Sequence, residues 1–151
     1  MDFKSIKDLN KYLKSKINDT LSDDVAIEVK LQMAEGVRTV VYKAGEPRIY
    51  IRRGIYPTSM GLGDITKMHH KVNNEVLIVT DDAELDRSYS RSDADYSKSL
   101  AENIEYGYGN KHEWYNKPRR FIRDSKDKLG TNKYHVKAMK TGLTKRGLIV
   151  E

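Results

Sequence analysis

Apolar residues at the start of the chain recur at every third or fourth position. Lysine, aspartate and other polar residues fill the positions between them. This spacing places the apolar side chains on one side of a helix, because a helix makes one turn in about 3.6 residues. We therefore predict an amphipathic helix over residues 3–18 that ends near Thr20. The members of the apolar row are Phe3, Ile6, Leu9, Leu13 and Ile17.

A second helix is predicted to begin at Ser22, because a serine followed by two aspartates is a good N-cap with an acidic first turn. Residues 25–44 then allow two interpretations. Alternate residues are apolar over residues 25–33, as in a strand that turns at Glu35-Gly36. Apolar residues also fall at helical spacing along the whole segment. Periodicity alone leaves strand and helix open.

The best strand signal is the β-branched run at residues 75–80. Residues 81–98 are mostly serine, aspartate, arginine and tyrosine, which predicts a long mobile loop. Glycine and proline set the bounds of the later elements. These are a short helix over residues 100–106 stopped by Gly107, a helix from Pro118 to Leu129 capped by Gly130, a last helix from Thr131 to Thr141, and a strand at Leu148-Ile149-Val150.

Composition narrows the class of protein. The chain has 151 residues, 38% of them hydrophobic, and no cysteine, so we expect residues 1–151 to form a single domain. The lack of cysteine excludes disulfides, thiolate zinc sites and thiol nucleophiles. The longest apolar run, Val76–Val79, is far short of the roughly 20 residues of a membrane span. The first residues lack the apolar region of a secretory signal, so we expect a cytoplasmic product with no membrane partner.

The positive charge is unevenly distributed along the chain. The whole chain carries a formal charge of +6, from 28 lysines and arginines and 22 aspartates and glutamates. Residues 111–151 hold 12 of the basic and 4 of the acidic residues, whereas residues 1–110 hold 16 and 18. It is therefore a basic C-terminal region, and not the chain as a whole, that needs an explanation.

Catalytic and metal motifs find little support. His69, His70 and His112 raise the question of a metal-dependent nuclease, but adjacent histidines point in different directions and no carboxylate stands at a recognisable ligand offset. We interpret them as solvated loop histidines and predict no metal and no cofactor. Phosphate-loop, EF-hand and nucleophile-elbow patterns are missing. We expect a protein that is not an enzyme, with a nuclease as the last alternative.

Two arginine pairs stand beside apolar residues. Arg52-Arg53 follows Ile49-Tyr50-Ile51, and Arg119-Arg120 precedes Phe121-Ile122. Arginine forks onto carboxylates and phosphates and stacks on aromatic rings, so such pairs suit protein interfaces and phosphates equally well. Ten tyrosines are also more than a small core needs, and tyrosine, tryptophan and arginine dominate interface hot spots. The pattern favours an assembly over a merely solvated surface.

The basic region leaves open a nucleic-acid interface. Lys133, Lys137 and Lys140 lie on one face of the predicted last helix, and such a face suits a phosphate backbone. No DNA-binding or RNA-binding motif accompanies it. A charged helix face is more often the solvent side of the helix.

Several short segments stand out along the chain. They are Val25–Tyr42, Pro47-x-x-Tyr50-x-Arg52-Arg53, Gly61-Leu62 before an aspartate, Leu100-Ala101-x-x-Ile104-Glu105-Tyr106-Gly107, Pro118-Arg119-Arg120-Phe121-Ile122-Arg123-Asp124 and Gly142-Leu143-x-x-x-Gly147. Their order resembles that of a known family, the minor tail or tail-completion proteins of phages and defective prophages, which are encoded between capsid and tail-tube genes. The resemblance covers about residues 22–150. Two departures are the displaced proline before Phe121, where the family has Arg-Pro-Phe, and the polar stretch 81–98.

The resemblance implies an α+β fold in which long helices pack on a small antiparallel sheet, and it favours a helix over residues 25–44. It also implies a virion structural protein of the head–tail junction, made in the host cytoplasm. This would be a neck subunit that forms a homo-oligomeric ring, contacts connector or head-closure proteins and tail terminator or tube proteins, and lets DNA pass through its lumen. A tail terminator ring is the alternative within this class, and a basic nucleic-acid-binding protein is the alternative outside it.

The resemblance and the arginine-aromatic pattern together give the expected site. Aromatic residues are expected to anchor the interface, and arginines are expected to donate paired hydrogen bonds through their guanidinium groups. An ion pair is expected between Glu105 and Arg52 or Arg120. The polar loop 81–98 of one subunit is expected to face the basic residues 111–146 of the next. The expected interface residues are Tyr50, Arg52, Arg53, Glu105, Tyr106, Arg119, Arg120 and Phe121, and the expected DNA-facing residues are Lys133, Lys137 and Lys140.

Overall fold

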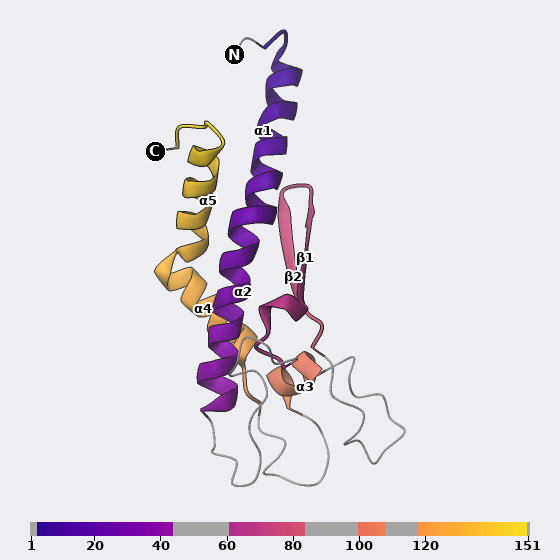
Figure 1. The fold of residues 1–151 in the computed structure, drawn as a ribbon, viewed down its shortest axis with the longest axis vertical. Coiled ribbons are helices and arrows are strands. Elements are labelled where there is room, and N and C mark those ends of the chain that lie inside the picture. Colours follow the sequence, from indigo (N-terminus) through magenta and orange to yellow (C-terminus); the bar gives the residue numbers. More distant parts are fainter. Residues whose placement is uncertain (1–2, 44–60, 84–99, 108–117, 151) are drawn as a thin grey trace.

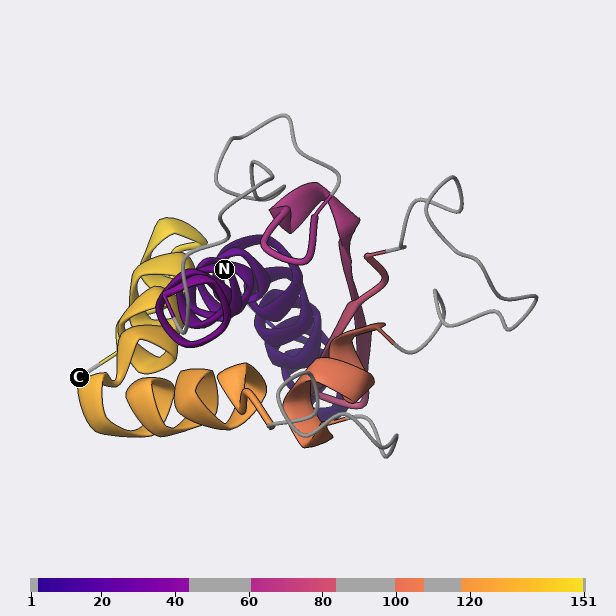
Figure 2. The ribbon, with the colours of Figure 1, turned by 90° about the horizontal axis from the view of Figure 1, so that it is seen from below.

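The fold centres on one long helix with the two C-terminal helices on one side and a β-hairpin on the other (Figure 1). It is given by a computed structural model that describes residues 3–43, 61–83, 100–107 and 118–150. Seen along the long helix, α4 (Phe121–Asn132) and α5 (Tyr134–Lys145) lie on one side and the hairpin on the opposite side (Figure 2). The predicted α+β class, with long helices packed on a small antiparallel sheet, is confirmed.

The long helix runs without a break over 37 residues. It comprises α1 (Ile6–Thr20), a π-helical segment η1 (Leu21–Val25), α2 (Ala26–Gly36) and a second π-helical segment η2 (Val37–Tyr42). The hydroxyl of Ser5 caps its start by accepting the backbone N–H of Asp8 at 3.1 Å. The predicted amphipathic helix is confirmed from Ile6 onward, but its predicted start at residue 3 and its predicted end near Thr20 are wrong. The ambiguous segment that follows is helical as far as Tyr42.

The predicted helix start at Ser22 is wrong. Leu21 keeps right-handed helical angles, with φ −61° and ψ −42°, so the first helix does not end there. The Ser22 hydroxyl lies 3.1 Å from Nε2 of His70 on the hairpin and caps no helix. Local sequence favoured a cap, whereas tertiary contacts carry the helix through this point in a wider π turn.

The hairpin follows a short 3₁₀ turn, Ile65–Lys67, and consists of β1 (Met68–Asn73) and β2 (Val76–Asp81). The strands are antiparallel, and Met68 pairs with Asp81. The predicted strand at residues 75–80 is confirmed, but β1 was not predicted, because His69, His70 and Lys71 hide its alternation. Its turn, Asn74-Glu75, has positive φ at both positions, as a tight two-residue hairpin requires.

Three helices complete the described fold. The short helix α3 (Leu100–Tyr106) ends where predicted, before Gly107 with its φ of +80°. The helix α4 (Phe121–Asn132) begins three residues after Pro118 and continues past Gly130, so the predicted bounds of this helix are wrong. The last helix α5 (Tyr134–Lys145) begins three residues after the predicted start at Thr131, which lies in α4, and ends four residues after the predicted end at Thr141. Residues 148–150 form no strand.

A small core holds the lower end of the long helix against α3 and α4. Its most deeply buried member is Phe121, which is 0% exposed. Partly buried side chains from η2 and α3 pack around it. Most of the predicted mobile loop 81–98 lies outside the described residues, apart from the end of β2 and two residues beyond it. The core members are Val37, Val41, Leu62, Ala83 and Phe121.

Two glycines mark the places where other helices cross the long helix most closely. A Cβ atom on Gly36 would lie 2.9 Å from the backbone oxygen of Phe121 and closer still to Ser125 Oγ. A Cβ atom on Gly142 would lie 2.5 Å from Thr20 Cγ2 and 2.6 Å from Asp24 Oδ2. We call the first contact, between α2 and α4, the α4 crossing, and the second, between α5 and the η1 region, the α5 crossing. Only glycine fits either approach.

Candidate interaction surface

The predicted interface residues fall into two groups. Tyr50, Arg52 and Arg53 lie outside the described residues. The other five lie where α3 meets the start of α4, so two segments that are separate in sequence do come together there. In this arrangement some of the five hold the fold and others face solvent.

Glu105 holds the start of α4. Its side chain accepts the backbone N–H of Ile122 at 2.8 Å and that of Arg123 at 3.2 Å, and the residue is only 5% exposed. A carboxylate at this place satisfies the free N–H groups of a helix start and interacts favourably with the helix dipole. Within the described residues it forms no ion pair with the exposed Arg120. The expected partner Arg52 lies outside them.

Arg119 and Phe121 also tie elements together. The backbone N–H of Arg119 donates to Ile104 O at 2.8 Å, and its Nη1 lies 3.4 Å from the backbone oxygen of Val41. The ring of Phe121 is buried in the core. Tyr106, by contrast, is 72% exposed at the end of α3. Of the five residues, Tyr106 and Arg120 are therefore the ones that project to solvent.

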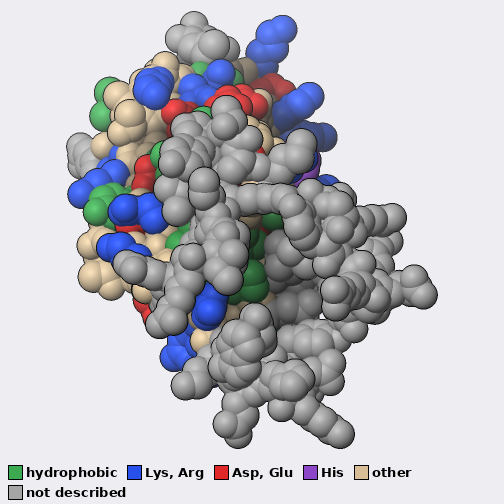
Figure 3. Space-filling model, turned by 60° about the horizontal axis from the view of Figure 1, so that its bottom comes forward, with side chains coloured by type: hydrophobic (Ala, Val, Ile, Leu, Met, Phe, Trp, Pro, Cys, Tyr) green, Lys and Arg blue, Asp and Glu red, His purple; other side chains and the backbone are tan. Residues whose placement is uncertain are grey.

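The lysines expected to face DNA are all exposed but do not share one helix. Lys133 separates α4 from α5 in a left-handed conformation, with φ +56°. Its carbonyl accepts the N–H of Lys137 at 3.0 Å, and Lys137 Nζ lies 5.6 Å from the centre of the Tyr134 ring. Lys137 and Lys140 both belong to α5. Lysine and arginine side chains are spread widely over the described surface in Figure 3.

Part of the basic excess is neutralised within the chain, at the α5 crossing. Arg146 donates to Asp24 Oδ2 at 2.5 Å and to Asp23 Oδ2 at 2.7 Å, and Lys145 lies 3.1 Å from Asp24 Oδ1. Burial raises the pKa of Asp24, but hydrogen bonds from Arg146 and Lys145 outweigh this and leave the pKa below its ordinary value. The two aspartates that resembled a helix start thus bind the C-terminal helix.

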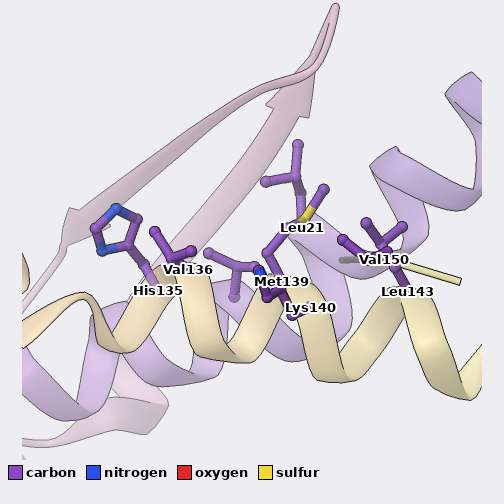
Figure 4. Close-up of a pocket in the computed structure, with 8 residues that line it drawn as sticks. Leu21, His135, Val136, Met139, Lys140, Leu143 and Val150 are labelled. Carbon is purple, nitrogen blue, oxygen red and sulfur yellow. The ribbon is translucent and has the colours of Figure 1, made fainter.

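An apolar groove of about 340 Å³ runs between α5 and the η1 region. Figure 4 shows its lining side chains in a row along α5, with His135 near one end and Val150 near the other. Nδ1 of His135 is buried and has no hydrogen-bond partner among the described residues. The groove was not predicted, because its walls are far apart in sequence. They are Leu21, Val25, His135, Val136, Met139, Lys140, Leu143 and Val150.

The outer face of the hairpin carries two exposed apolar side chains among polar ones. Val76 is 57% and Ile78 49% exposed, and the two point the same way because they are two residues apart on one strand. Lys71 lies opposite Ile78 on the same face. The inner face, with Met68, packs on the long helix.

The chain matches the YomN family model over residues 5–145. It belongs to the YomN family. YomN itself is a protein of the Bacillus prophage SPβ, so the prophage association that the sequence resemblance implied is confirmed at this coarse level. Comparisons with curated proteins and with solved structures give no match.

The YomN match spans the long helix, the hairpin and the helices α3 to α5, and ends just before Arg146. His69 and His70, which were expected in a loop, lie in strand β1 and do not converge on one site. His70 contacts Ser22, while His69 points to the other face of β1 and lies 3.7 Å from Asp82; His112 lies outside the described residues. Within the described ranges no group of three metal-binding side chains is found, and no helix is long and apolar enough to cross a membrane.

Proposed function

We propose that this YomN-family chain is a non-enzymatic virion structural protein of the head–tail junction, a tail-completion subunit that forms a ring in the neck. Its neighbours would be connector or head-closure proteins on one side and tail terminator or tube proteins on the other. The sequence resemblance and the prophage association of the family support this assignment. Its chemistry is binding between subunits.

The observation that carries the proposal is the exposed hairpin. A two-stranded sheet is marginally stable by itself and presents unpaired backbone groups along both edges. Here its outer face also leaves Val76 and Ile78 about half exposed. Open strand edges beside two exposed apolar side chains suit a contact with a neighbouring subunit, which would pair the edges and cover these side chains.

Exposed lysines suit the lumen of a ring through which DNA passes. From Lys128 to Val150 the chain contains lysine and arginine but no aspartate or glutamate. Lys133, Lys137 and Lys140 are exposed there. Weak contacts between lysine and phosphate, without base readout, would let DNA slide.

The test is deletion of this gene from the prophage, followed by induction and electron microscopy of the particles. We expect filled heads and tails of normal length that remain unjoined, and intact virions when the chain is supplied from a plasmid. Overlong tails would favour the tail terminator instead. Normal virions without the chain would refute both ring assignments.

A basic nucleic-acid-binding protein is the second candidate, and the run of residues 128–150 without acidic side chains favours it. Binding of the purified chain to double-stranded DNA should then fall steeply with salt, because each phosphate contact releases a counterion. Replacing Lys137 and Lys140 with glutamate would abolish such binding. Binding that is tight at physiological salt, with normal virions in the deletion strain, would favour this candidate over the neck protein.

A further inference from the structure

The first turns of α1 carry a row of side chains that the rest of the described fold covers only in part. Ile6, Leu13 and Thr20 are seven residues apart, so they lie along one face of the helix. Thr20 is 0% exposed, with Gly142 of α5 packed against it, whereas Leu13 is partly buried and Ile6 is 80% exposed. In Figure 1, α1 extends beyond the upper ends of α5 and the hairpin. The helix α5 therefore covers one end of the row and leaves the other end open.

Further apolar side chains widen the open end of this row. Leu9 lies one turn after Ile6 and is partly buried. The ring of Phe3, a residue that is 39% exposed, lies 5.3 Å from the ring of Tyr12. Aromatic residues are enriched in protein interfaces. We call this group of residues the α1 tip; it consists of Phe3, Ile6, Leu9, Tyr12 and Leu13.

The charges around the α1 tip are almost all positive. Residues 3–17 contain five lysines and one aspartate. The aspartate, Asp8, accepts the hydroxyl of Ser5 at 2.8 Å, and Lys14 forms an ion pair with Glu75 of the hairpin at 3.0 Å. Such a surface repels a second copy of itself and attracts acidic groups. The lysines of this segment that have no carboxylate partner among the described residues are Lys4, Lys7, Lys11 and Lys16.

The position of α5 favours a helix as the occupant over a flat surface such as a membrane. At Thr20, α5 stands on the same side of the long helix as the row, so a flat surface that followed the row would meet α5. A single helix can instead lie in line with α5 and continue its packing along α1. Narrow apolar rows with seven-residue spacing are typical of contacts between two helices.

We propose that the α1 tip binds an amphipathic helix of another protein that carries acidic residues beside its apolar row. Lysines border the α1 row on both sides, because Lys7 directly follows Ile6 and Lys16 comes three residues after Leu13. Burial of the apolar side chains supplies affinity, and the lysines select an acidic helix over a basic one. The inference goes beyond the neck assignment and does not rest on it.

Two designed peptides test this preference with the purified full-length chain. Both have three heptads with leucine at positions a and d; one has glutamate and the other lysine at positions e and g. We expect fluorescence anisotropy to show that the labelled acidic peptide binds at least tenfold more tightly than the basic peptide. The difference should shrink at about 1 M salt, because ions screen the lysines.

Matched variants test whether the apolar row binds the acidic peptide. Ile6→Gln should weaken binding at least tenfold, because a fully exposed isoleucine that the partner covers is lost. Ile27→Gln is the control, since it makes the same change at an isoleucine of α2 that is 56% exposed, and it should leave binding unchanged. Circular dichroism checks that both variants are folded.

A charge reversal tests the selection of an acidic partner. Lys7→Glu/Lys16→Glu should weaken binding of the acidic peptide at least tenfold and should strengthen binding of the basic peptide. The control Lys126→Glu/Lys137→Glu changes the net charge equally at exposed lysines of α4 and α5, and it should change neither affinity more than twofold. A purely structural role of Lys7 and Lys16 would not exchange the two preferences.

Cysteine labelling locates the bound peptide, because the chain has no native cysteine. An acidic peptide that carries a maleimide should label Asn10→Cys, beside the row, at least tenfold faster than Asp127→Cys on α4; both positions are exposed. Adding Ile6→Gln should remove this advantage. Equal labelling of the two positions would contradict binding at the α1 tip.

The remaining outcomes separate other occupants and the neck assignment. The inference is overturned if the acidic peptide binds no more tightly than the basic one or if Ile6→Gln and Ile27→Gln bind it alike. It is also overturned by a dimer in sedimentation that Ile6→Gln dissociates, or by Ile6-dependent binding to phosphatidylglycerol vesicles without binding of the peptide. If the peptide binds as expected but the deletion strain makes normal virions, the α1 contact stands and the neck role falls. If no peptide binds but heads and tails stay unjoined, the reverse holds.

Discussion

The α4 crossing and the α5 crossing both depend on a glycine that allows close helix packing, but different side-chain interactions stabilise the two contacts. In each, a glycine lets a helix approach the long helix too closely for any other residue. At the α4 crossing the contact is buried and neutral. Ser125, 2% exposed, lies with its Oγ 2.6 Å from Phe121 O and 3.1 Å from Gln32 O. At the α5 crossing, Arg146 and Lys145 bind two aspartates at the edge of solvent.

This difference predicts which of the two helix contacts depends on salt and pH and which does not. Neutral, buried hydrogen bonds are insensitive to salt, whereas ion pairs at the surface weaken as ions screen them. The α4 crossing borders the core, so its loss should unfold the chain. The α5 crossing holds the helix that forms the wall of the groove. We therefore expect salt and acid to loosen α5 before they affect the core.

The largest expected effect is that of Gly36→Ala. The new methyl group would overlap both Ser125 Oγ and a backbone oxygen, and the backbone cannot move aside without shifting α4. We expect the free energy of unfolding to fall by about 2–3 kcal/mol. Gly142→Ala should cost less, about 1–2 kcal/mol, because it meets side-chain atoms only. Urea titrations of both variants measure the difference, and equal losses would contradict this ranking.

Next in size is Arg146→Met, which keeps the aliphatic stem and removes the guanidinium. Asp23 loses its cation and Asp24 loses one of two, so we expect a loss of about 1–2 kcal/mol at low salt. The loss should shrink markedly at about 1 M salt. Ser125→Ala, the matched change at the α4 crossing, should cost about 1 kcal/mol at either salt concentration. A loss for Arg146→Met that does not depend on salt would show that the network works through packing alone.

Acid should have the same effect as removal of the arginine. Because the folded-state pKa of Asp24 is lowered, its contribution to stability is present above its unfolded pKa of about 4 and is lost as the pH falls below that value. The difference between the natural chain and Arg146→Met should therefore narrow from neutral pH to about pH 3. Urea midpoints at both pH values provide the measurement.

The sequence pattern predicted those elements that are determined by residues within or next to them. The apolar row of α1, the β-branched residues of β2 and the glycine after α3 each act within a few residues. The α5 crossing could not be predicted in this way, since Arg146 and Asp24 are separated by 122 positions in sequence. The same separation explains the wrong helix start at Ser22. In the sequence, a pair of aspartates that stabilises a helix start cannot be distinguished from a pair that binds a distant arginine.

The candidate interaction surface shows the same limit. Five of the predicted interface residues lie in segments that meet at the α3–α4 junction. Residue type could not tell which side chains face outward, because Glu105 turns toward the backbone of α4 and Tyr106, its neighbour, turns to solvent. The groove combines side chains from both ends of the chain. Only the packing of α5 on the long helix brings them together.

A smaller effect is expected at the base of the hairpin, where Asp81→Asn should stabilise the chain. Burial raises the pKa of Asp81 to about 6, helped by Asp82 and Asp64 and opposed by a hydrogen bond from the N–H of Ala83. A raised acid pKa stabilises the fold at low pH, and this stabilisation is lost as the pH rises from about 4 to 6.

Asparagine keeps the oxygen that accepts the N–H of Ala83 at 3.0 Å but carries no charge. We expect the variant to be about 1 kcal/mol more stable than the natural chain at pH 7.5 and equal to it at pH 4, after allowance for partial solvent exposure of the carboxylate. Because its sign is opposite to that of Asp24, this variant also isolates the acid response of the α5 crossing. A gain of the same size at both pH values would contradict the pKa of Asp81.

The smallest expected effect, from Gly130→Ala, calibrates both crossings. Gly130 lies inside α4, and no atom lies within 4 Å of the position that its Cβ would take, so alanine adds helix propensity without a clash. We expect a gain of about 0.5–1 kcal/mol. The same gain in helix propensity partly offsets the loss of stability in Gly36→Ala and in Gly142→Ala. Adding this gain to each measured loss therefore gives the steric cost of that crossing alone. If Gly130→Ala instead lowers the urea midpoint, α4 needs flexibility before the turn at Lys133, and helix propensity cannot serve as the common reference for the two crossings.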